Sequence, residues 1–338
     1  VDLGGGDDFS YKTAFGNNAN ISWGAGDDIA QIKMSASDLS SLNMTNFDGG
    51  SGSDTLYFAE STLTSGYTLD LTEGGATNFE NITGSDAAET INGDANANIL
   101  KGGKGFDKIY GFGGDDTIVS GDGDDWVLGG AGSDQITDGI GKAMIIGDLG
   151  TITANATQHL VSVVTKDTGI GAADTITKTD GDAIVLAGAG GDTVTTGAGN
   201  SVLLGDFGSV VTDGAGIIRS ITSADTSLGG DDTISAGAGG ASVFGGFGSD
   251  NITTGDGDDA ILGDVGTLTF VDGIRSKLVG TIEAPSYGAG DTILTNGGED
   301  WVIGGAAADK ITNISGASAA LGDAGVITAD AAGRYISV

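Results

Sequence analysis

A five-residue line, Leu-Gly-Asp-Xaa-Gly, recurs along the chain at a fixed spacing and constrains its fold more than any other feature. It stands at residues 204–208, 262–266 and 321–325, and a variant beginning with Ile stands at 146–150. The first glycines of these copies are residues 147, 205, 263 and 322, so the spacings are 58, 58 and 59. A second line, Asp-Thr-Ile, begins at residues 116, 174, 232 and 291 with the same spacings. Two independent markers with one period predict an array of structural repeats. The chain begins at Val1 and ends at Val338, soon after its fourth copy opens at Gly322, so we expect a fragment of a longer array.

The charge balance limits the possible partners. The chain has 13 Lys and Arg residues against 47 Asp and Glu, a formal net charge of −34. Such a chain repels polyanions, which excludes nucleic acid and anionic membrane surfaces as expected direct partners. No apolar run approaches the roughly 18 residues of a membrane-spanning helix, so we expect no membrane insertion either. Cations are the natural partners.

Gly and Cys usage indicates a turn-rich fold with an unusual cross-link. Of the 338 residues 65 are Gly and 1 is Pro, so the backbone turns often in conformations that only Gly tolerates. The chain has no Cys, so no disulfide can staple it. Metal ions are the alternative cross-link.

Each 58-residue block contains a shorter period of nine residues, clearest at 102–110 and 129–137. From residue 75 the register is unbroken through eight nonapeptides; it then breaks at an insert and resumes in groups of four at residues 169, 227 and 286. A three-residue strand after a six-residue Gly-rich turn is too short to stand alone, but parallel stacking would pair its backbone groups and align an apolar eighth place. That place holds Ile82, Ile91, Leu100, Ile109, Ile118, Val127, Ile136 and Ile145 in the first run.

The line Gly-Gly-Xaa-Gly-Xaa-Asp followed by an apolar residue resembles the haemolysin-type, or repeats-in-toxin, calcium-binding repeat. The resemblance covers about residues 75–146, most of each later block, and the stretch Gly49–Leu56. It implies an all-β fold, a right-handed parallel β-roll or β-solenoid with two nine-residue half-turns per coil and calcium ions between neighbouring turns. It also implies type I secretion of the unfolded chain and folding outside the cell, and the repeat array suggests that the parent is a giant extracellular protein.

The register predicts a division into six segments. Residues 1–74 form irregular solenoid coils, with Asp8, Asp28 and Asp54 spaced 20 and 26 apart, and residues 75–110 form a plain nonapeptide roll. Four super-repeats follow at 111–168, 169–226, 227–285 and, truncated, 286–338.

The sixth-place Asp is the expected calcium ligand. Calcium takes six to eight oxygens, so one turn supplies half a cage and the next turn on the same edge supplies the rest. On the first edge every block has a complete pair: Asp116 and Asp134, Asp174 and Asp192, Asp232 and Asp250, Asp291 and Asp309. Asp54 and Asp107 join these stronger candidates. Backbone carbonyls of turn glycines such as Gly103, Gly105, Gly130, Gly132, Gly246 and Gly248 are expected to complete the cages. The alternative is that these Asp residues are only solvated turn formers.

The second edge predicts a weaker row. Its sixth places are Asp125 and Ala143, Ala183 and Ser201, Ala241 and Asp259, and Asp300 and Ser318, so no block holds a complete pair. We therefore predict one filled calcium row and one partial row. The weaker candidates are Asp8, Asp28, Asp125, Asp259 and Asp300, together with Asp148, Asp206, Asp264 and Asp323 at the second place of each insert, which either close the calcium row or cap a turn.

The inserts occupy 147–168, 205–226, 263–285 and the stretch from 322 onward. Each begins like another turn and then becomes β-rich, as at 267–271, with a turn near Asp272-Gly273. We favour a third coil with a longer outer loop, advancing each block by about 14 Å, over a protruding hairpin. The basic residues His159, Arg219, Arg275 and Arg334, one from each insert, are expected to balance neighbouring Asp charges. Trp126 and Trp301 share a seventh place and are expected to pack under an insert loop rather than to stack on sugars.

The composition contains few residues of a catalytic site. The chain has one His, no Cys and no nucleophile elbow or phosphate loop. We predict no enzyme but a calcium-rigidified structural element of a long secreted or cell-surface bacterial protein, such as an adhesin, sheath, surface-layer or matrix fibre. Neighbouring copies of the rod or a surface polysaccharide are the further partners considered. The alternative function is a calcium-dependent folding and export module of a secreted enzyme or toxin.

Overall fold

The computed structural model describes residues 2–12, 20–33, 44–58, 67–72, 75–157, 159–166, 171–224, 228–281, 288–313, 316, 318–330 and 334–337. These residues form β-strands and one short 3-10 helix, η1 (Met44–Asn46). They divide into two compact units, 1–141 and 142–338. The expected segment boundaries at residues 74, 168, 226 and 285 lie outside the described residues. Among the described residues, no helix has the length and apolar character needed to cross a membrane.

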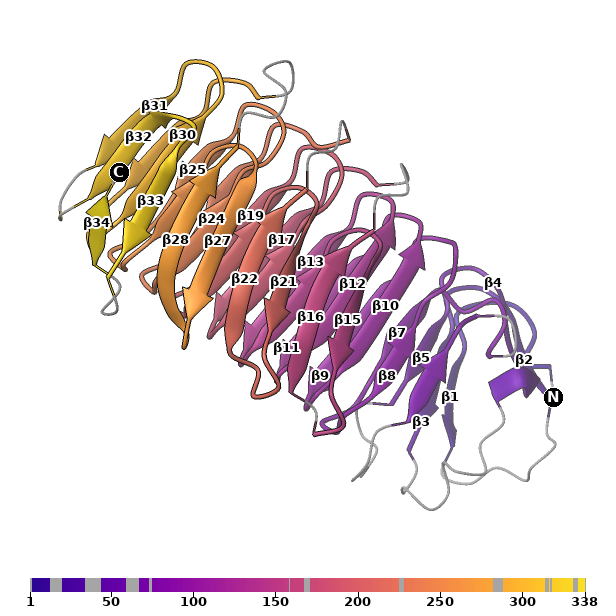
Figure 1. The fold of residues 1–338 in the computed structure, drawn as a ribbon. Helices are drawn as coiled ribbons and strands as arrows, with labels where there is room; N and C mark the ends of the chain where they lie inside the picture. The colour runs from indigo at the N-terminus through magenta and orange to yellow at the C-terminus, as the bar shows by residue number, and fades with distance from the viewer. Residues whose placement is uncertain are drawn as a thin grey trace. The chain divides into compact units, whose positions relative to one another are not determined.

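The first unit is built from parallel strands that alternate between two sheets (Figure 1). Sheet I contains, in pairing order, β1 (Phe9–Lys12), β3 (Ile29–Ile32), β5 (Thr55–Tyr57), β7 (Asn81–Thr83), β9 (Ile99–Lys104), β11 (Thr117–Asp122) and β13 (Gln135–Ile140). Sheet II contains β6 (Thr68–Asp70), β8 (Thr90–Asn92), β10 (Lys108–Gly113) and β12 (Trp126–Ala131). A further parallel pair joins β2 (Ile21–Ala25) to β4 (Phe47–Ser51).

The second unit repeats this alternation. Its sheet I strands are β17 (Thr175–Asp180), β19 (Thr193–Thr196), β23 (Thr233–Ser235), β25 (Asn251–Thr253), β29 (Thr292–Thr295) and β31 (Lys310–Asn313). Its sheet II strands are β14 (Ala143–Ile146), β18 (Ala183–Leu186), β20 (Ser201–Leu204), β24 (Ala241–Phe244), β26 (Ala260–Leu262), β30 (Trp301–Gly305) and β32 (Ala319–Asp323). The predicted parallel β-roll is confirmed.

The eighth-place side chains form the core between the two sheets. Ile118 pairs in register with Leu100 on one side and Ile136 on the other, and all three are fully buried. In the second unit Val185 pairs with Leu203, which pairs with Val243, again with no exposed surface. Each strand of the roll is short, so this shared apolar stack, rather than any single strand, holds the coils together.

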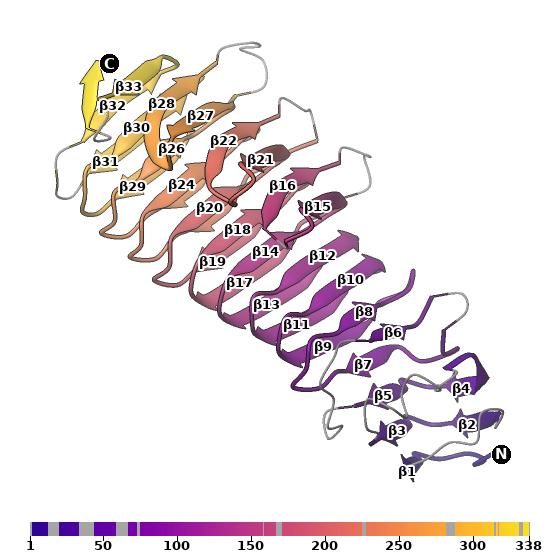
Figure 2. The same ribbon diagram turned by 60° about the horizontal axis from the view of Figure 1, so that its bottom comes forward.

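The inserts are antiparallel hairpins, so the favoured third coil is wrong and the hairpin alternative is right. Together they form sheet III, with the order β15 (Gly150–Ala154), β16 (Leu160–Thr165), β21 (Gly208–Thr212), β22 (Ile218–Ser223), β27 (Gly266–Val271), β28 (Ile274–Gly280), β33 (Val326–Ala329) and β34 (Tyr335–Ser337). Figure 2 shows the hairpins stacked side by side along one face of the second unit. Asp272 and Gly273 form the predicted turn of the third hairpin, with φ of 52° and 80° that suit a two-residue loop.

Sheet III covers the outer face of sheet II and creates a second core. Its inner row pairs Val163 with Val210 and Ile221 with Leu268, and all four are fully buried. Opposite them, every sheet II strand of this unit except the last, β32, is buried along its whole length, for example at Val202, Leu203 and Leu204. Sheet I strands instead alternate exposed Thr with a buried apolar residue, as in β19. Sheet II is therefore an apolar layer buried on both faces in this unit.

A hairpin adds no coil to the solenoid. Leu203 pairs with Val185 before it and with Val243 after it in the same parallel sheet, although a whole hairpin lies between Leu203 and Val243 in the sequence. Each 58-residue block therefore contains two coils, and it advances by about 10 Å rather than about 14 Å at the usual strand spacing.

Candidate calcium-binding turns

The first-edge turns, which precede the sheet I strands, are joined by a ladder of aspartates. The backbone N–H of each sixth-place residue donates to Oδ1 of the sixth-place Asp one coil further on. In the first unit the N···O distances are 2.7 Å from Asn98 to Asp116 and 2.8 Å from Asp116 to Asp134. In the second unit the ladder joins Asp174, Asp192, Asp232, Asp250, Asp291 and Asp309 with distances of 2.7, 2.7, 2.9, 2.8 and 3.0 Å. The structure thus brings together every predicted first-edge pair.

The other carboxylate oxygen of many of these residues is buried without a hydrogen-bond partner among the described residues. This holds for Oδ2 of Asp116, Asp192, Asp232, Asp250, Asp291 and Asp309. All of these residues except Asp309 are at most 2% exposed. A buried anionic oxygen with no donor is costly, so a repeated row of them fits a bound cation far better than solvated turn formers.

Glycine at the first place of the turn leaves room beside this oxygen. A Cβ added at Gly111 would lie 2.2 Å from Oδ2 of Asp116, and one at Gly245 would lie 2.2 Å from Oδ2 of Asp250. Backbone carbonyls approach the same place, since the Gly129 oxygen lies 2.3 Å from the Cβ position of Gly111. The turn therefore brings an anionic oxygen and carbonyl oxygens together, which is the donor set that calcium prefers.

Burial raises the pKa of the first-edge carboxyls, because desolvation penalises their charged form. The pKa rises to about 7 for Asp116 and Asp134 and to about 8 for Asp192, Asp250 and Asp291. The pKa of Asp232 is raised further, by burial first and then by the charges of Asp206, Asp192 and Asp250. A bound divalent cation would reverse these shifts and keep the carboxylates charged.

Backbone conformation supports the predicted carbonyl donors. Gly103, Gly105, Gly130 and Gly132 all have φ between 118° and 125°, where a side chain would be strained. Among the described residues, no three His, Cys, Asp or Glu side chains gather as a metal-binding cluster. An ion in these turns would therefore rely on one or two carboxylates completed by carbonyl oxygens.

Comparison with protein families agrees with this geometry. Six stretches match the family described as the RTX calcium-binding nonapeptide repeat, at residues 83–111, 92–127, 119–151, 179–209, 240–267 and 287–313. The chain contains RTX calcium-binding repeats. Its repeats bind Ca²⁺ at multiple sites. No curated protein sequence matches the chain.

The RTX ladder extends into the irregular N-terminal coils. The N–H of Asp8 donates to Asp28 (2.6 Å), that of Asp28 to Asp54 (2.8 Å), and that of Asp54 to Oε2 of Glu80 (2.7 Å). Oδ2 of all three Asp residues is buried without a hydrogen-bond partner among the described residues. The coils here are longer than two nonapeptides, yet they keep the first-edge register.

The second edge holds two aspartate pairs that the comparison within single blocks did not consider. The N–H of Asp107 donates to Asp125 at 2.8 Å, and that of Asp259 donates to Asp300 at 3.2 Å. Both pairs lie outside or across the 58-residue blocks, because neighbouring coils meet there whichever block they belong to. Ala143, Ala183, Ser201 and Ala241 still leave the edge incomplete between these pairs.

Side chains fill the first place of many second-edge turns in the RTX roll. Thr196, Thr254 and Thr295 stand where most first-edge turns have glycine and one has Ala187, and all three are buried. They join local polar networks, such as Thr295 Oγ1 accepting from Asn313 Nδ2 at 2.9 Å. Lys178 occupies this place in its turn, is 1% exposed and donates from Nζ to the carbonyl oxygen of Asp180. Hydroxyls and an ammonium group thus take room that first-edge turns keep open.

The hairpins are inserted inside first-edge turns, between the second and third places. Gly205 N donates to the Phe244 oxygen, as expected for a first-place residue, and a Cβ at Gly205 would lie 1.9 Å from Oδ2 of Asp232. Gly205 and Asp206 are therefore places one and two of the turn that ends at Asp232, with Gly229 at place three. The same arrangement puts Asp148 and Asp264 at place two, 3% exposed, whereas Asp323 is exposed.

The basic residues of the inserts and the two Trp residues make contacts of different kinds. Arg275 of β28 lies over the Trp301 ring, 5.2 Å from its centroid, so Trp301 packs under an insert as predicted. Trp126 instead contacts Phe106 edge-on and the Lys108 ammonium. The other three residues of this set bond locally: Arg334 pairs with Asp330 (2.8 Å), Arg219 pairs with Asp213 (2.6 Å), and His159 contacts the Thr157 hydroxyl at 3.0 Å.

Sequence reasoning missed four residues of the RTX turns. Glu80 and Glu89 stand at sixth places and both take part in the aspartate ladder. Oε2 of Glu80 accepts from Asp54 N at 2.7 Å, and Glu89 N donates to Asp107 at 2.8 Å. Asp138 and Lys178 stand at first places and are buried. The nonapeptide register already assigned all four to turn positions, but only Asp at the sixth place, or at the second place of an insert, was considered as a ligand.

Proposed function

We propose that the chain is a calcium-rigidified structural solenoid of a long secreted or cell-surface protein, such as an adhesin, sheath or surface-layer fibre. The observation that carries this proposal is the first-edge ladder, in which buried carboxylates repeat coil after coil and many leave one oxygen free of donors among the described residues. Calcium bound along the ladder would join each coil to the next and stiffen the stack. In this proposal the ligands are the ladder Asp residues with turn carbonyls, on the first edge throughout and on the second edge at Asp107–Asp125 and Asp259–Asp300.

The hairpin sheet supports a structural rather than a catalytic role. None of its eight strands contains Asp or Glu, although the chain carries a net charge of −34. Its outer face exposes Thr151, Thr153, Val164 and Val211. Such a face is suited to lateral contact with a neighbouring copy of the rod or with a surface polysaccharide, because the described strands of this sheet carry no carboxylate.

Calcium titration of the full chain tests the proposal. Circular dichroism in excess chelator should show a largely disordered chain, and β-signal should appear cooperatively as calcium reaches about 0.1–1 mM, the range of extracellular modules. Magnesium at the same ionic strength is the matched control, since it demands a tighter octahedral geometry. A chain that keeps its β-signal in chelator would exclude a calcium-rigidified solenoid.

The export-module alternative makes a different prediction about the parent protein. If the parent carries tens of further 58-residue copies, the chain is part of a fibre. A catalytic or toxic domain adjoining a short run of repeats would favour the export module.

A further inference from the structure

In three first-edge turns, which we call the interrupted turns, a hairpin is inserted directly after the Asp at the second place. These aspartates therefore stand at the junction between the calcium row and the hairpins. We propose that Asp148, Asp206 and Asp264 are additional calcium ligands that clamp the base of each hairpin to the first-edge row. This proposal rests on the proposed calcium row and adds one carboxylate to that row once per 58-residue block.

Each of these side chains lies between two neighbouring first-edge turns. Asp206 receives N–H bonds from Gly230 of its own turn (3.2 Å) and from Phe247 of the next turn. Asp148 and Asp264 receive the equivalent bond from Ala189 and Ala306. One carboxylate therefore connects two coils at the level where calcium ions are expected.

The surroundings of each carboxylate are built from glycine. The position of a Cβ at Gly229 lies 2.1–2.2 Å from the Asp206 carboxylate, and one at Gly246 lies 2.4 Å from its Oδ2. A Cβ at Gly171 or Gly188 would similarly clash with the Asp148 carboxylate, and one at Gly288 or Gly305 would clash with the Asp264 carboxylate. Any side chain at these places would displace the carboxylate, so the sequence keeps this space open in all three interrupted turns.

Buried oxygens without donors lie around the clamp. Oδ1 of Asp264 accepts no hydrogen bond among the described residues, and the residue is 3% exposed. Oδ2 of Asp192 and Oδ2 of Asp232 likewise accept no hydrogen bond among the described residues. Asp232 also lies close enough to Asp206, Asp192 and Asp250 to feel their negative charges. Several buried carboxylates at close range repel one another, and a shared divalent cation offsets that repulsion while using the free oxygens.

The clamp would couple calcium to the hairpin because the two are adjacent in sequence. Phe207 follows Asp206 directly, and β21 begins at Gly208, where a Cβ would lie 2.2 Å from Cδ2 of the buried Leu204. Fixing Asp206 therefore fixes the first residue of the strand against sheet II. The recurring line Leu-Gly-Asp-Xaa-Gly contains all of these parts: the buried Leu, the open first place, the clamp and the close-packed Gly.

Substitution of Asp206 by Asn separates a calcium ligand from a simple turn cap. Asn keeps an oxygen that accepts the Phe247 N–H but loses the charge, so a cap would survive and a calcium ligand would not. We would measure calcium stoichiometry and affinity by titration calorimetry of the full chain, and hydrogen exchange of the 208–223 amides at subsaturating calcium. Asp256→Asn, an exposed residue with the same charge change, is the matched control, and Asp232→Asn removes a ladder ligand.

We expect Asp206→Asn to lose one ion or weaken it by about tenfold, and to speed exchange at the base of the hairpin, while Asp256→Asn changes neither. Wild-type stoichiometry, affinity and exchange in Asp206→Asn, with weakened binding in Asp232→Asn, would overturn the clamp and leave the calcium row intact. Unchanged binding in both Asp206→Asn and Asp232→Asn would instead refute the row on which the clamp rests. Circular dichroism at saturating calcium verifies that each variant folds.

Discussion

The first-edge turns and the hairpin sheet of the same coils are built on opposite principles. The turns bury one carboxylate per coil, and residues such as Asp192 and Asp250 leave an oxygen without a donor among the described residues. The hairpin strands contain no Asp or Glu and bury an apolar row against sheet II. Cohesion of the turns therefore depends on a cation from solution, whereas the hairpins are held by the hydrophobic effect and backbone pairing. The two regions should respond to different perturbations.

Calcium removal should have the largest effect and should reach both regions. Without cations the buried ladder carboxylates repel one another, so the parallel sheets lose cohesion and sheet III loses the surface on which it packs. Hydrogen exchange in chelator should show protection lost in sheet I and in the hairpin amides together. Hairpins that stay protected while the turns exchange freely would show that sheet III is stable by itself.

Truncation of the shared core should be the next largest effect. Leu203→Ala removes a fully buried side chain of sheet II and should destabilise the calcium-bound chain by about 2–5 kcal/mol. The matched control, Val211→Ala, removes a side chain that is 39% exposed on the outer face of sheet III and should change stability by less than about 0.5 kcal/mol. Thermal unfolding at fixed calcium compares them; equal losses would mean that the outer face is covered.

Acid should act on the turns and spare the hairpins. The calcium-free folded state raises the pKa of Asp192 from 3.8 to about 8, so it binds protons that the unfolded chain releases. Its stability without calcium is therefore greatest below about pH 4 and is lost as the pH rises towards 8. Calcium must displace these protons, so its affinity should fall as the pH is lowered from 8 to 6. Calorimetry at both values measures this, and an unchanged affinity would contradict the buried geometry of the ligands.

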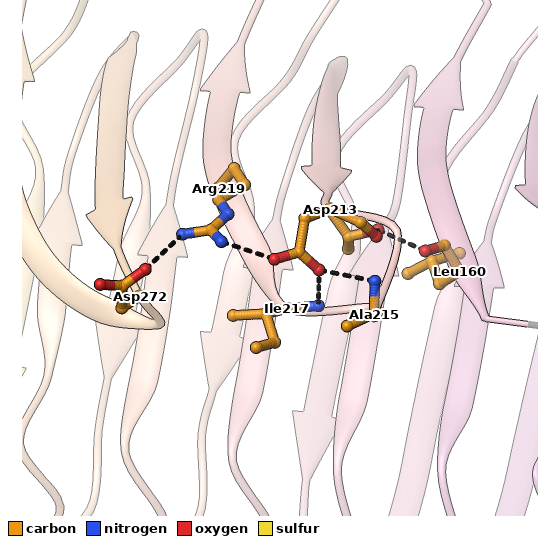
Figure 3. A network of polar contacts seen from close by, with 7 residues as sticks. Leu160, Asp213, Ala215, Ile217, Arg219 and Asp272 are labelled. Carbon is orange, nitrogen blue, oxygen red and sulfur yellow. Dashed lines mark hydrogen bonds and ion pairs between the residues drawn. The ribbon is translucent and has the colours of Figure 1, made fainter.

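The hairpin tips should give the smallest effect. Arg219 joins Asp213 of its own hairpin to Asp272 of the next at 2.6 and 3.4 Å (Figure 3), but it is 38% exposed. Such pairs are screened by salt and contribute little. Arg219→Met should leave the unfolding midpoint nearly unchanged while removing part of its salt dependence. A large drop would indicate that hairpin-to-hairpin pairing, rather than burial on sheet II, holds sheet III in place.

The nine-residue period was enough to locate the main core and the ladder, because both follow directly from position in the repeat. Ile118 and Asp116 were assigned from spacing alone, and the structure buries both. The period could not reveal contacts that cross a block, so the Asp259–Asp300 pair was missed. Such contacts depend on which coils are stacked, and the insert that separates the two residues in sequence hides that.

The prediction of a third coil was wrong because the first two residues of each insert belong to an ordinary first-edge turn. Gly147 and Asp148 occupy places one and two, so the insert seemed to continue the roll. A signal was nevertheless present: the sheet II runs Met144-Ile145-Ile146 and Val202-Leu203-Leu204 are apolar throughout, whereas sheet I runs such as Thr193-Val194-Thr195 alternate. A continuous apolar run predicts a strand buried on both faces, and therefore a covering layer.

The position of each hairpin within its turn makes it an interchangeable cassette. It leaves the roll after place two and returns at place three, so strand pairing on either side does not depend on how many residues lie between. A segment of different length or sequence could be spliced between Asp206 and Gly229 without shifting the register of any later coil. The same junction that ties the hairpin to the roll thus allows its tip to diverge from copy to copy, and offers a site at regular intervals for grafting new binding loops.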